Sequence, residues 1–477
     1  MFDLVIKNGL IVTMDNKRRV FDGDIGIESN NITFVGERLP SNLCGSHTKV
    51  IDASGKIVLP GFVNTHIHTP MGLWRGLGDD LDCLNIHRKV TYPLGLSIHA
   101  RVNYPMCSFV QKEEAYFSAL LCCIEMLKGG TTTFLDNQYL LADPENTSMV
   151  CKAVAEVGLR GNIAFGLQDD PIAPTRWSSI SECESMLDYL LTTWHRKEND
   201  RIKIWLHPVI PGVWETPEMC KQARIWANKY GLRITTHLGD TWDRVKTVQE
   251  RYGDKNITLF CERTGLLGED VVMAHCQWIT KDEIDLLRET DTRASHMAAF
   301  NLCEGDLVAP IIRMMRSGIK VGLGTDAPTS SNNADMLECM KFAALVHKGH
   351  HLDPQIISGE RVLEMATIEG AMVIGQDDEI GSLEVGKKAD ITLVNWQQPH
   401  MIPLYRPVSV LVYCANAGDV DTVIVDGKVL MEGRRVLTID ENEVLKKAQE
   451  KAEKLVQKAG NQEVAYRDWL SLPKINY

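Results

Sequence analysis

The chain carries, near its beginning, the run Val58-Leu59-Pro60-Gly61-Phe62-Val63-Asn64-Thr65-His66-Ile67-His68. Its apolar residues are typical of a buried strand, and the strand ends in two histidines separated by one residue. Residues i and i+2 of a strand point to the same side, so the two imidazoles can bind one divalent metal ion. A metal held in this way activates a water molecule, and the run therefore favours a hydrolase.

The middle of the chain, residues 61–370, alternates apolar strand-like runs with helical stretches. This alternation predicts a parallel (β/α)8 barrel of the TIM type, whose active site lies at the carboxyl ends of the strands. After the first strand, the predicted barrel strands are Thr131–Asp136, Gly161–Gly166, Ile202–His207, Arg233–His237, Val271–His275, Thr292–Ser295 and Lys320–Asp326.

The two ends of the chain have the pattern of short strands and turns. We expect residues 1–60 and 371–440 to form one composite β domain, a small β-sandwich, with the barrel inserted between its halves. The ends of a domain often lie close together, which makes such an insertion reasonable. Residues 441–477 begin with a stretch rich in Glu, Lys and Ala and are expected to form a helical tail.

Composition sets the class of protein. The chain has 477 residues and a net charge of −12, which argues against a nucleic acid as partner. No apolar run reaches roughly 18 residues, so we expect no membrane-spanning helix. The N-terminus lacks the pattern of a signal peptide, and the 13 cysteines include no CxxC pair. These features predict reduced thiols in a cytoplasmic protein.

Several predicted strands end on a residue whose side chain can bind a metal ion or transfer a proton. His207, His237 and His275 each end a strand, Asp326 ends the last one, and Asp240 follows His237 by three residues. Taken alone, such a histidine is more often a structural hydrogen-bonding residue, and such an aspartate is more often a helix N-cap. Their joint occurrence on the rim of one predicted barrel indicates a metal-assisted active site.

These motifs resemble those of a known family. The run Pro60–His68, the segment Gly129-Gly130-Thr131-Thr132-Thr133, His237, His275 and the segment Gly324-Thr325-Asp326 are similar to the metal-dependent amidohydrolase superfamily. Within it, the chain resembles the branch of S-adenosylhomocysteine/methylthioadenosine deaminases and triazine hydrolases such as atrazine chlorohydrolase. The resemblance covers nearly the whole chain and is more specific for the superfamily than for a substrate.

The resemblance implies a metal site and roles for its neighbours. One Zn²⁺ per chain, or alternatively Fe²⁺, would be bound by His66, His68, His237 and Asp326. Asp326 would also act as general base, and His275 would bond to the water or to the developing oxyanion, or alternatively be an additional metal ligand. Contacts to a small-molecule substrate would come from His207, Trp74 and Asn301. A homo-oligomer is expected from the resemblance alone.

Two positions depart from the deaminase pattern. Deaminases of this branch carry His-x-x-Glu, whose glutamate protonates a ring nitrogen, whereas this chain has His237-Leu238-Gly239-Asp240. The acid is shorter by one methylene, and Phe300 stands where the family commonly has a small polar residue. We still expect hydrolysis of a non-peptide C–N bond in a small nitrogen heterocycle, most simply a deamination, with Asp240 as a catalytic acid.

Other functions stay open at this point. The same site would suit hydrolysis of an acyclic urea, carbamate or amide, or displacement of a halide from a triazine, if no ring nitrogen has to be protonated. A metal-free barrel used as a scaffold or binding protein is a further alternative, which the complete set of candidate ligands disfavours.

Overall fold

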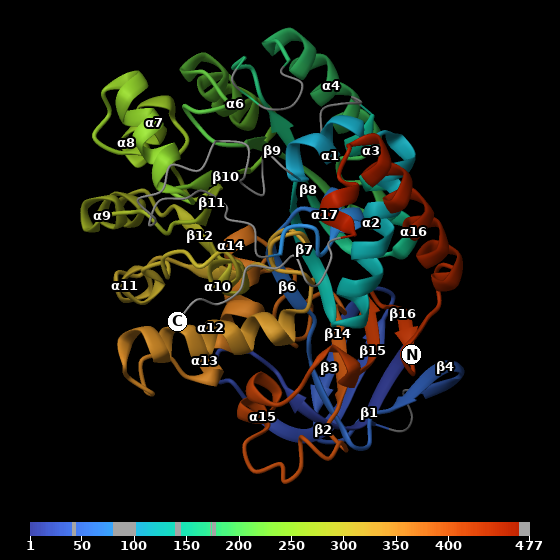
Figure 1. The fold of residues 1–477 in the computed structure, drawn as a ribbon. Coiled ribbons are helices and arrows are strands. Elements are labelled where there is room, and N and C mark those ends of the chain that lie inside the picture. Colours follow the sequence, from blue (N-terminus) through green and yellow to red (C-terminus); the bar gives the residue numbers. More distant parts are fainter. Residues whose placement is uncertain (41–43, 80–101, 139–144, 172, 174–177, 467–477) are drawn as a thin grey trace.

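The computed structural model describes residues 1–477 except 41–43, 80–101, 139–144, 172, 174–177 and 467–477. Within the described residues, eight parallel strands pair in chain order and form the centre of the molecule (Figure 1). They are β6 (Phe62–Ile67), β7 (Thr131–Asn137), β8 (Arg160–Leu167), β9 (Ile202–Pro208), β10 (Ile234–Leu238), β11 (Val271–His275), β12 (Arg293–His296) and β13 (Val321–Leu323).

The first and last strands close this sheet into a barrel. A parallel bridge joins Ile67 to Asp326, and the Thr65 hydroxyl donates to the carbonyl oxygen of Leu323 at 2.9 Å. The strands are buried along almost their whole length, because a barrel strand is covered by side chains inside and by helices outside. The predicted (β/α)8 barrel is therefore confirmed.

Helices surround the barrel (Figure 1). Their limits follow local signals: Ser179 and Glu182 form a capping box at the start of α4, and Gly231 ends α6 in the left-handed region at φ 64°. The helices are α1 (Tyr104–Phe109), α2 (Lys112–Lys128), α3 (Asn146–Val157), α4 (Ile180–Thr193), α5 (Lys197–Asp200), α6 (Pro217–Tyr230), α7 (Trp242–Tyr252), α8 (Ile257–Thr264), α9 (Lys281–Glu289), α10 (Ala298–Cys303), α11 (Ile311–Arg316), α12 (Met336–His351), α13 (Gly359–Ala366) and α14 (Ile368–Ile374).

The two chain ends meet in one mixed sheet, as expected. Its order in the described residues is β17-β16-β15-β14-β5-β1-β2-β3, and β4 pairs with β1. The antiparallel pair β5–β14 joins the amino-terminal half to the carboxy-terminal half. The strands are β1 (Phe2–Val12), β2 (Val20–Glu28), β3 (Asn31–Gly36), β4 (Cys44–Asp52), β5 (Lys56–Pro60), β14 (Ile391–Asn395), β15 (Val420–Val425), β16 (Lys428–Glu432) and β17 (Arg435–Val436).

A buried ion pair fastens this terminal sheet to the barrel. Arg160, at the start of β8, donates from Nε and Nη2 to Asp390 at 2.9 and 3.1 Å, and its Nη2 lies 3.6 Å from Asp426. All three side chains are at most 3% exposed, so each charge depends on the others for compensation. The domain limits expected from the sequence stay a prediction.

The remaining helices complete the carboxy-terminal part. α15 (Pro407–Tyr413) lies by the terminal sheet, and α16 (Glu441–Lys458) and α17 (Gln462–Ala465) follow β17. α16 packs on α2, where Lys128 bonds to Glu441 at 2.8 Å. Residues 467–477 of the predicted tail lie outside the described residues. Each helix in the described part of the chain is too short or too polar to span a bilayer.

Candidate metal centre and active site

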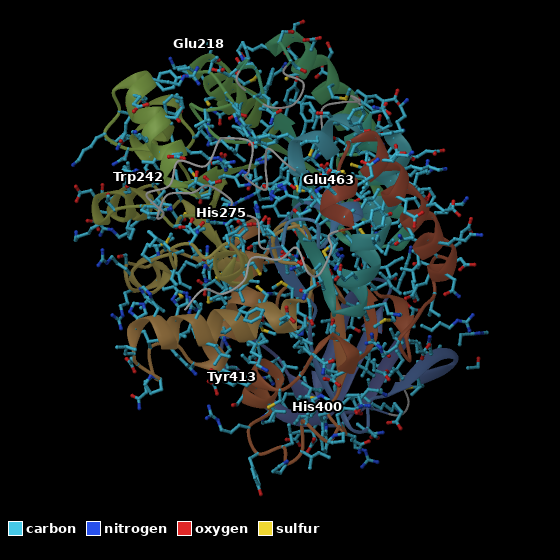
Figure 2. The ribbon with its side chains drawn as sticks, viewed as in Figure 1. Glu218, Trp242, His275, His400, Tyr413 and Glu463 are labelled. Carbon is cyan, nitrogen blue, oxygen red and sulfur yellow. The ribbon has the colours of Figure 1, made fainter. Side chains whose placement is uncertain are left out.

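Five histidine and aspartate side chains from four strands of the barrel converge at the carboxyl ends of those strands. His66 lies on β6 and His68 directly follows it, His237 lies on β10, His275 ends β11, and Asp326 follows β13. Each of these residues is at most 5% exposed. Figure 2 shows His275 well away from the terminal sheet, beside which His400 is labelled.

The ligand atoms of this cluster are close enough to share one cation. His66 Nε2 and His68 Nε2 lie 3.7 and 3.5 Å from Asp326 Oδ1, and His237 Nε2 lies 3.4 Å from His68 Nε2. His275 Nε2 lies 3.8 Å from Asp326 Oδ2. Metal–nitrogen bonds of about 2.0–2.1 Å in a tetrahedral site separate neighbouring ligand atoms by roughly 3.3 Å. The cluster therefore has nearly the dimensions of a metal site.

Buried atoms of the cluster that make no hydrogen bond to the described residues include His66 Nε2 and Asp326 Oδ2. Buried polar atoms almost always have a partner, because an unsatisfied one keeps the full cost of leaving water. Imidazole nitrogens and a carboxylate oxygen are ligands that Zn²⁺ accepts. The residues present thus fit a divalent metal ion.

Hydrogen bonds hold the imidazoles so that their Nε2 atoms face one another. His68 Nδ1 donates to the carbonyl oxygen of Asn137 at 2.6 Å, and His237 Nδ1 donates to that of Val209 at 2.8 Å. His66 Nδ1 lies 2.9 Å from the side-chain amide nitrogen of Asn137. Such bonds at the far ring nitrogen orient a metal-binding histidine and leave Nε2 for the metal.

The backbone at two cluster residues is unusual. His275 has φ 72° and Asp326 has φ 65°, both in the left-handed region that residues with a Cβ seldom adopt. This conformation turns the chain at the end of β13, and the amide of Asp326 then donates to the carbonyl oxygen of His66 at 3.0 Å. The carboxylate is thereby brought beside the first histidine of the His66-Ile67-His68 motif.

Burial sets the protonation of the cluster. It lowers the pKa of His68 to about 4 and holds the pKa of His66 and His237 well below the usual range, because the charged imidazolium loses its hydration. The same loss raises the pKa of Asp326 to about 7. At neutral pH His66, His68 and His237 are therefore neutral and able to bind a metal, while Asp326 is near the midpoint of its titration.

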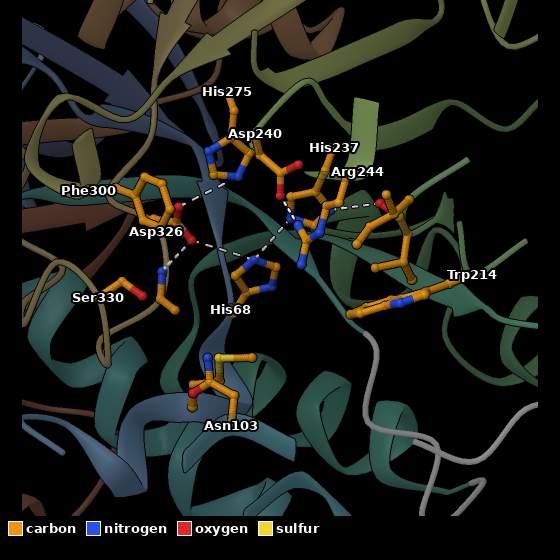
Figure 3. A pocket seen from close by; sticks show the side chains of 14 residues that line it. His68, Asn103, Trp214, His237, Asp240, Arg244, His275, Phe300, Asp326 and Ser330 are labelled. Carbon is orange, nitrogen blue, oxygen red and sulfur yellow. Dashed lines mark hydrogen bonds and ion pairs between the residues drawn. The ribbon is translucent and has the colours of Figure 1, made fainter. Parts of the chain in front are cut away.

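A cavity opens beside the cluster (Figure 3). Asp240 lies on its wall and receives a charge-assisted hydrogen bond from Arg244, four residues further along. The Phe300 ring contacts His275 with 4.9 Å between the ring centroids. The cavity is lined by His68, Met71, Asn103, Val209, Ile210, Trp214, His237, Asp240, Arg244, His275, Phe300, Asp326, Ala327 and Ser330. A polar end near the cluster and an indole further out suit a small aromatic ring.

The three expected substrate contacts do not line the described cavity. His207 is buried beside His237, with 5.2 Å between ring centroids, and its Nδ1 donates to the backbone of Thr235. Trp74 is buried, and its Nε1 donates to Asn103 Oδ1 at 3.2 Å. Asn301 is buried next to Phe300, yet of that pair only Phe300 lines the described cavity.

The sequence reasoning did not find several residues that line the cavity. Arg244 follows Asp240 by four residues, and this spacing on a helix was the one signal available for it. Trp214 and Asn103 reach the cavity from distant parts of the chain, and no local pattern marks them.

The comparisons with known proteins agree with this geometry. Residues 57–430 match the model of the amidohydrolase family. The chain belongs to that family. It is therefore a hydrolase that acts on carbon–nitrogen bonds other than peptide bonds, as the sequence motifs predicted.

Curated proteins similar to this chain include deaminases. The chain is 35% identical to the 5'-deoxyadenosine deaminase of Methanosarcina acetivorans over 460 residues, which cover 96% of this chain and 100% of the relative. It is 36% identical to the 5-methylthioadenosine/S-adenosylhomocysteine deaminase of Thermococcus onnurineus over 433 residues, or 91% and 95% of the two chains. The predicted resemblance to this deaminase branch is thus confirmed.

Solved structures share the fold. An adenosine deaminase of Xanthomonas campestris with bound zinc superposes with a TM-score of 0.84 at 23% identity, over 96% of this chain and 99% of that one. An atrazine chlorohydrolase of Arthrobacter aurescens complexed with zinc gives 0.83 at 23% identity, over 94% and 100%. Both neighbours bind zinc, which agrees with the metal-binding geometry of the cluster.

Proposed function

We propose that the chain is a zinc-dependent deaminase that releases ammonia from an amino-substituted nitrogen heterocycle. One observation carries the proposal: buried neutral imidazoles and a carboxylate meet at cation-binding distance next to an acid-lined cavity. The deaminase relatives, 35–36% identical over most of the chain, support the type of reaction. Zinc is preferred to Fe²⁺ because two neighbours of the same fold hold zinc.

The metal would be held by His66, His68, His237 and Asp326. When bound, it supplies a nucleophile at neutral pH by lowering the pKa of a water molecule. The second oxygen of Asp326 is buried and makes no hydrogen bond to the described residues, so it is placed to take a proton of that water. His275 Nε2 lies 3.8 Å from the same oxygen and would donate to the oxyanion that forms on the attacked carbon.

Asp240 would carry a proton to the ring. It is buried on the cavity wall, three residues after His237, and its Oδ1 accepts from the amide of Thr241 at 3.0 Å. An aspartate at this place can pass one proton of the attacking water to the ring nitrogen, while the second proton of that water, taken by Asp326 from the new hydroxyl, would leave with the amine as ammonia. His207, Trp74 and Asn301 stay predicted substrate contacts, although they do not line the described cavity.

The proposal is tested with the zinc-loaded enzyme. Aminopurines, aminopyrimidines and amino-triazines are incubated with it, and ammonia is measured. We expect ammonia from at least one class, a loss of about 10²–10⁴-fold in kcat for Asp240→Asn, and partial activity for Asp240→Glu. Absence of ammonia from every ring contradicts a deaminase, and an unchanged kcat in both variants contradicts the role of Asp240.

A separate observation favours a second candidate function. Arg244 donates to Oδ2 of Asp240, so one oxygen of the acid that would protonate the ring is already occupied. Hydrolysis of an acyclic urea, carbamate or amide, or loss of halide from a triazine, would tolerate this bond, because these reactions need no protonation of a ring nitrogen by Asp240. Measuring chloride release and urea hydrolysis alongside ammonia separates these reactions. Homo-oligomer formation and a cytoplasmic location stay predictions.

A further inference from the structure

Arg244 and Asp240 form a buried pair inside the cavity. Arg244 lies in the first turn of α7, and its Nη1 donates to Asp240 Oδ2. The two side chains are only 11% and 6% exposed, and the guanidinium carbon lies 5.4 Å from the centre of the Trp214 ring. Figure 3 shows the pair next to His237, with Trp214 to the right of Arg244 in this view.

The pair differs from the ordinary ion pairs of surface helices. Lys246 and Glu250 on the same helix have the same spacing of four residues, but both side chains are more than half exposed. Pairs of that kind contribute little and need no surrounding structure. Arg244 instead gives up most of its hydration in a cavity that also contains the catalytic residues. Burial of this kind has to be offset by hydrogen bonds.

The guanidinium of Arg244 has more hydrogen-bond donors than its described partner uses. It carries five N–H groups, and in the described part of the chain the structure gives it one hydrogen-bond acceptor, Asp240. The carboxylate on one side and the indole of Trp214 on the other restrict its orientation. Arg244 is therefore a preorganised donor. It would recognise a hydrogen-bond acceptor of the ligand that lies next to the atom contacted by Asp240.

The charge balance points to a neutral ligand atom. Asp240 already compensates the positive charge of Arg244, so a ligand carboxylate or phosphate would bring an additional negative charge beside Asp240. A carbonyl oxygen accepts from Arg244 without that repulsion.

We propose that Arg244 is a specificity-determining residue that donates to a ring carbonyl oxygen of the substrate. The inference rests on the proposed deaminase function, in which Asp240 contacts the ring nitrogen next to the amine-bearing carbon. Arg244 then faces the following ring atom. The substrate class is a heterocycle in which amine-bearing carbon, ring nitrogen and carbonyl carbon follow one another, as in 6-amino-2-oxopurines and 4-amino-2-oxopyrimidines.

Rings of the adenine type lack this oxygen. They present a C–H group at the place of the carbonyl, so the guanidinium would lose water without gaining a hydrogen bond. A site built to bond a polar group discriminates strongly against an analogue without it. The structure thus favours amino-oxo rings over the unsubstituted aminopurine of the adenosine-type relatives.

Two pairs of rings that differ only in this carbonyl test the inference. Isoguanine is compared with adenine, and cytosine with 4-aminopyrimidine, by measuring kcat/KM for ammonia release from the zinc-loaded enzyme. A hydrogen bond to a charged group corresponds to a preference of about 10- to 150-fold for the carbonyl ring. The ratio within each pair is measured in the same preparation, so a general loss of folded enzyme cancels.

Variants of Arg244 test whether this residue causes the preference for carbonyl rings. Arg244→Met should lower the ratio to about threefold or less, mainly through kcat/KM of the carbonyl rings, and Arg244→Lys should keep part of it as a single-point donor. Arg263→Gln is the matched control, because Arg263 also pairs with an aspartate, Asp254, but lies outside the cavity wall. Its ratio should equal that of the wild type.

The outcomes separate the inference from the proposed function. If no ring yields ammonia, the deaminase function fails and the inference fails with it. If the enzyme deaminates adenine-type rings as well as their carbonyl partners, the inference fails while the deaminase function stands. If the wild type prefers the carbonyl rings and Arg244→Met keeps the same preference, the assignment to Arg244 is wrong.

Discussion

Asn137 should control the affinity for the metal without being a ligand. It ends β7, where its carbonyl oxygen accepts from His68 Nδ1 at 2.6 Å and its side-chain amide nitrogen lies 2.9 Å from His66 Nδ1. Thr235 donates to its side-chain oxygen at 3.0 Å. When His66 Nε2 binds a metal, Nδ1 carries the proton, so we expect the amide to turn and accept from it while the Thr235 hydroxyl becomes the acceptor.

The magnitude follows from which of these contacts a substitution removes. Asn137→Ala deletes the partner of His66 but leaves the backbone carbonyl that holds His68. Loss of one such partner typically weakens metal binding by about 10- to 100-fold, or roughly 1.4–2.7 kcal/mol. Asn137→Asp keeps an acceptor for His66 Nδ1 and should stay within about threefold of the wild type.

The assay is a competition for Zn²⁺ between the protein and a coloured chelator, with the thermal midpoint of the metal-free protein measured alongside. Asn162→Ala is the control: Asn162 is also buried on a barrel strand, and its partners are Phe134 and Gln376 rather than ligands. It should lower the midpoint without changing zinc affinity. Equal zinc affinity in Asn137→Ala and wild type would refute the reasoning.

Three further predictions concern the ligand carboxylate, the junction with the terminal sheet and a glycine. Burial raises the pKa of Asp326 to about 7, and the metal needs its unprotonated form, so zinc affinity should fall below about pH 7 and level off above it, with about one proton released from Asp326 on binding well below pH 7 and almost none well above it; calorimetry in two buffers on each side of that pH measures the proton, and a pH-independent affinity would contradict the assignment. Arg160→Met leaves Asp390 buried without its cation and should cost about 3–5 kcal/mol in urea unfolding; a loss below about 1 kcal/mol would show that the pair is not needed. A Cβ on Gly324 would lie 2.7 Å from His66 Cβ, so Gly324→Ala should lower the zinc content measured by elemental analysis, and a full equivalent of zinc would disprove this.

The barrel was predictable because its strands are local patterns. The predicted strand Val271–His275 agrees with β11, and Thr131–Asp136 falls one residue short of β7. Apolar runs ending in a polar residue describe a strand that is covered on both sides and ends at the rim. The last strand is shorter than the predicted Lys320–Asp326, because the positive φ of Asp326 turns the chain after Leu323.

The residues of the candidate site also fall into two groups, those that local sequence patterns predicted and those that they did not. The ligand candidates were found because each stands at a strand end, where the parallel barrel forces neighbours together. Trp74 could not be placed from its neighbourhood in sequence, since its indole turns to Asn103, a residue 29 positions later. Arg244 and Trp214 meet across the cavity although α7 and the loop after β9 are separate elements.

The linear order of residues was enough to specify a metal-binding hydrolase on a β/α barrel, because side-chain alternation along a strand and the chemistry of imidazole and carboxylate are local properties. The folded molecule was needed to show that Asp240 is paired with Arg244, and that His207 and Trp74 stand behind the cavity wall. Those facts depend on how helices and loops pack over long sequence separations, and no short-range periodicity encodes such distances.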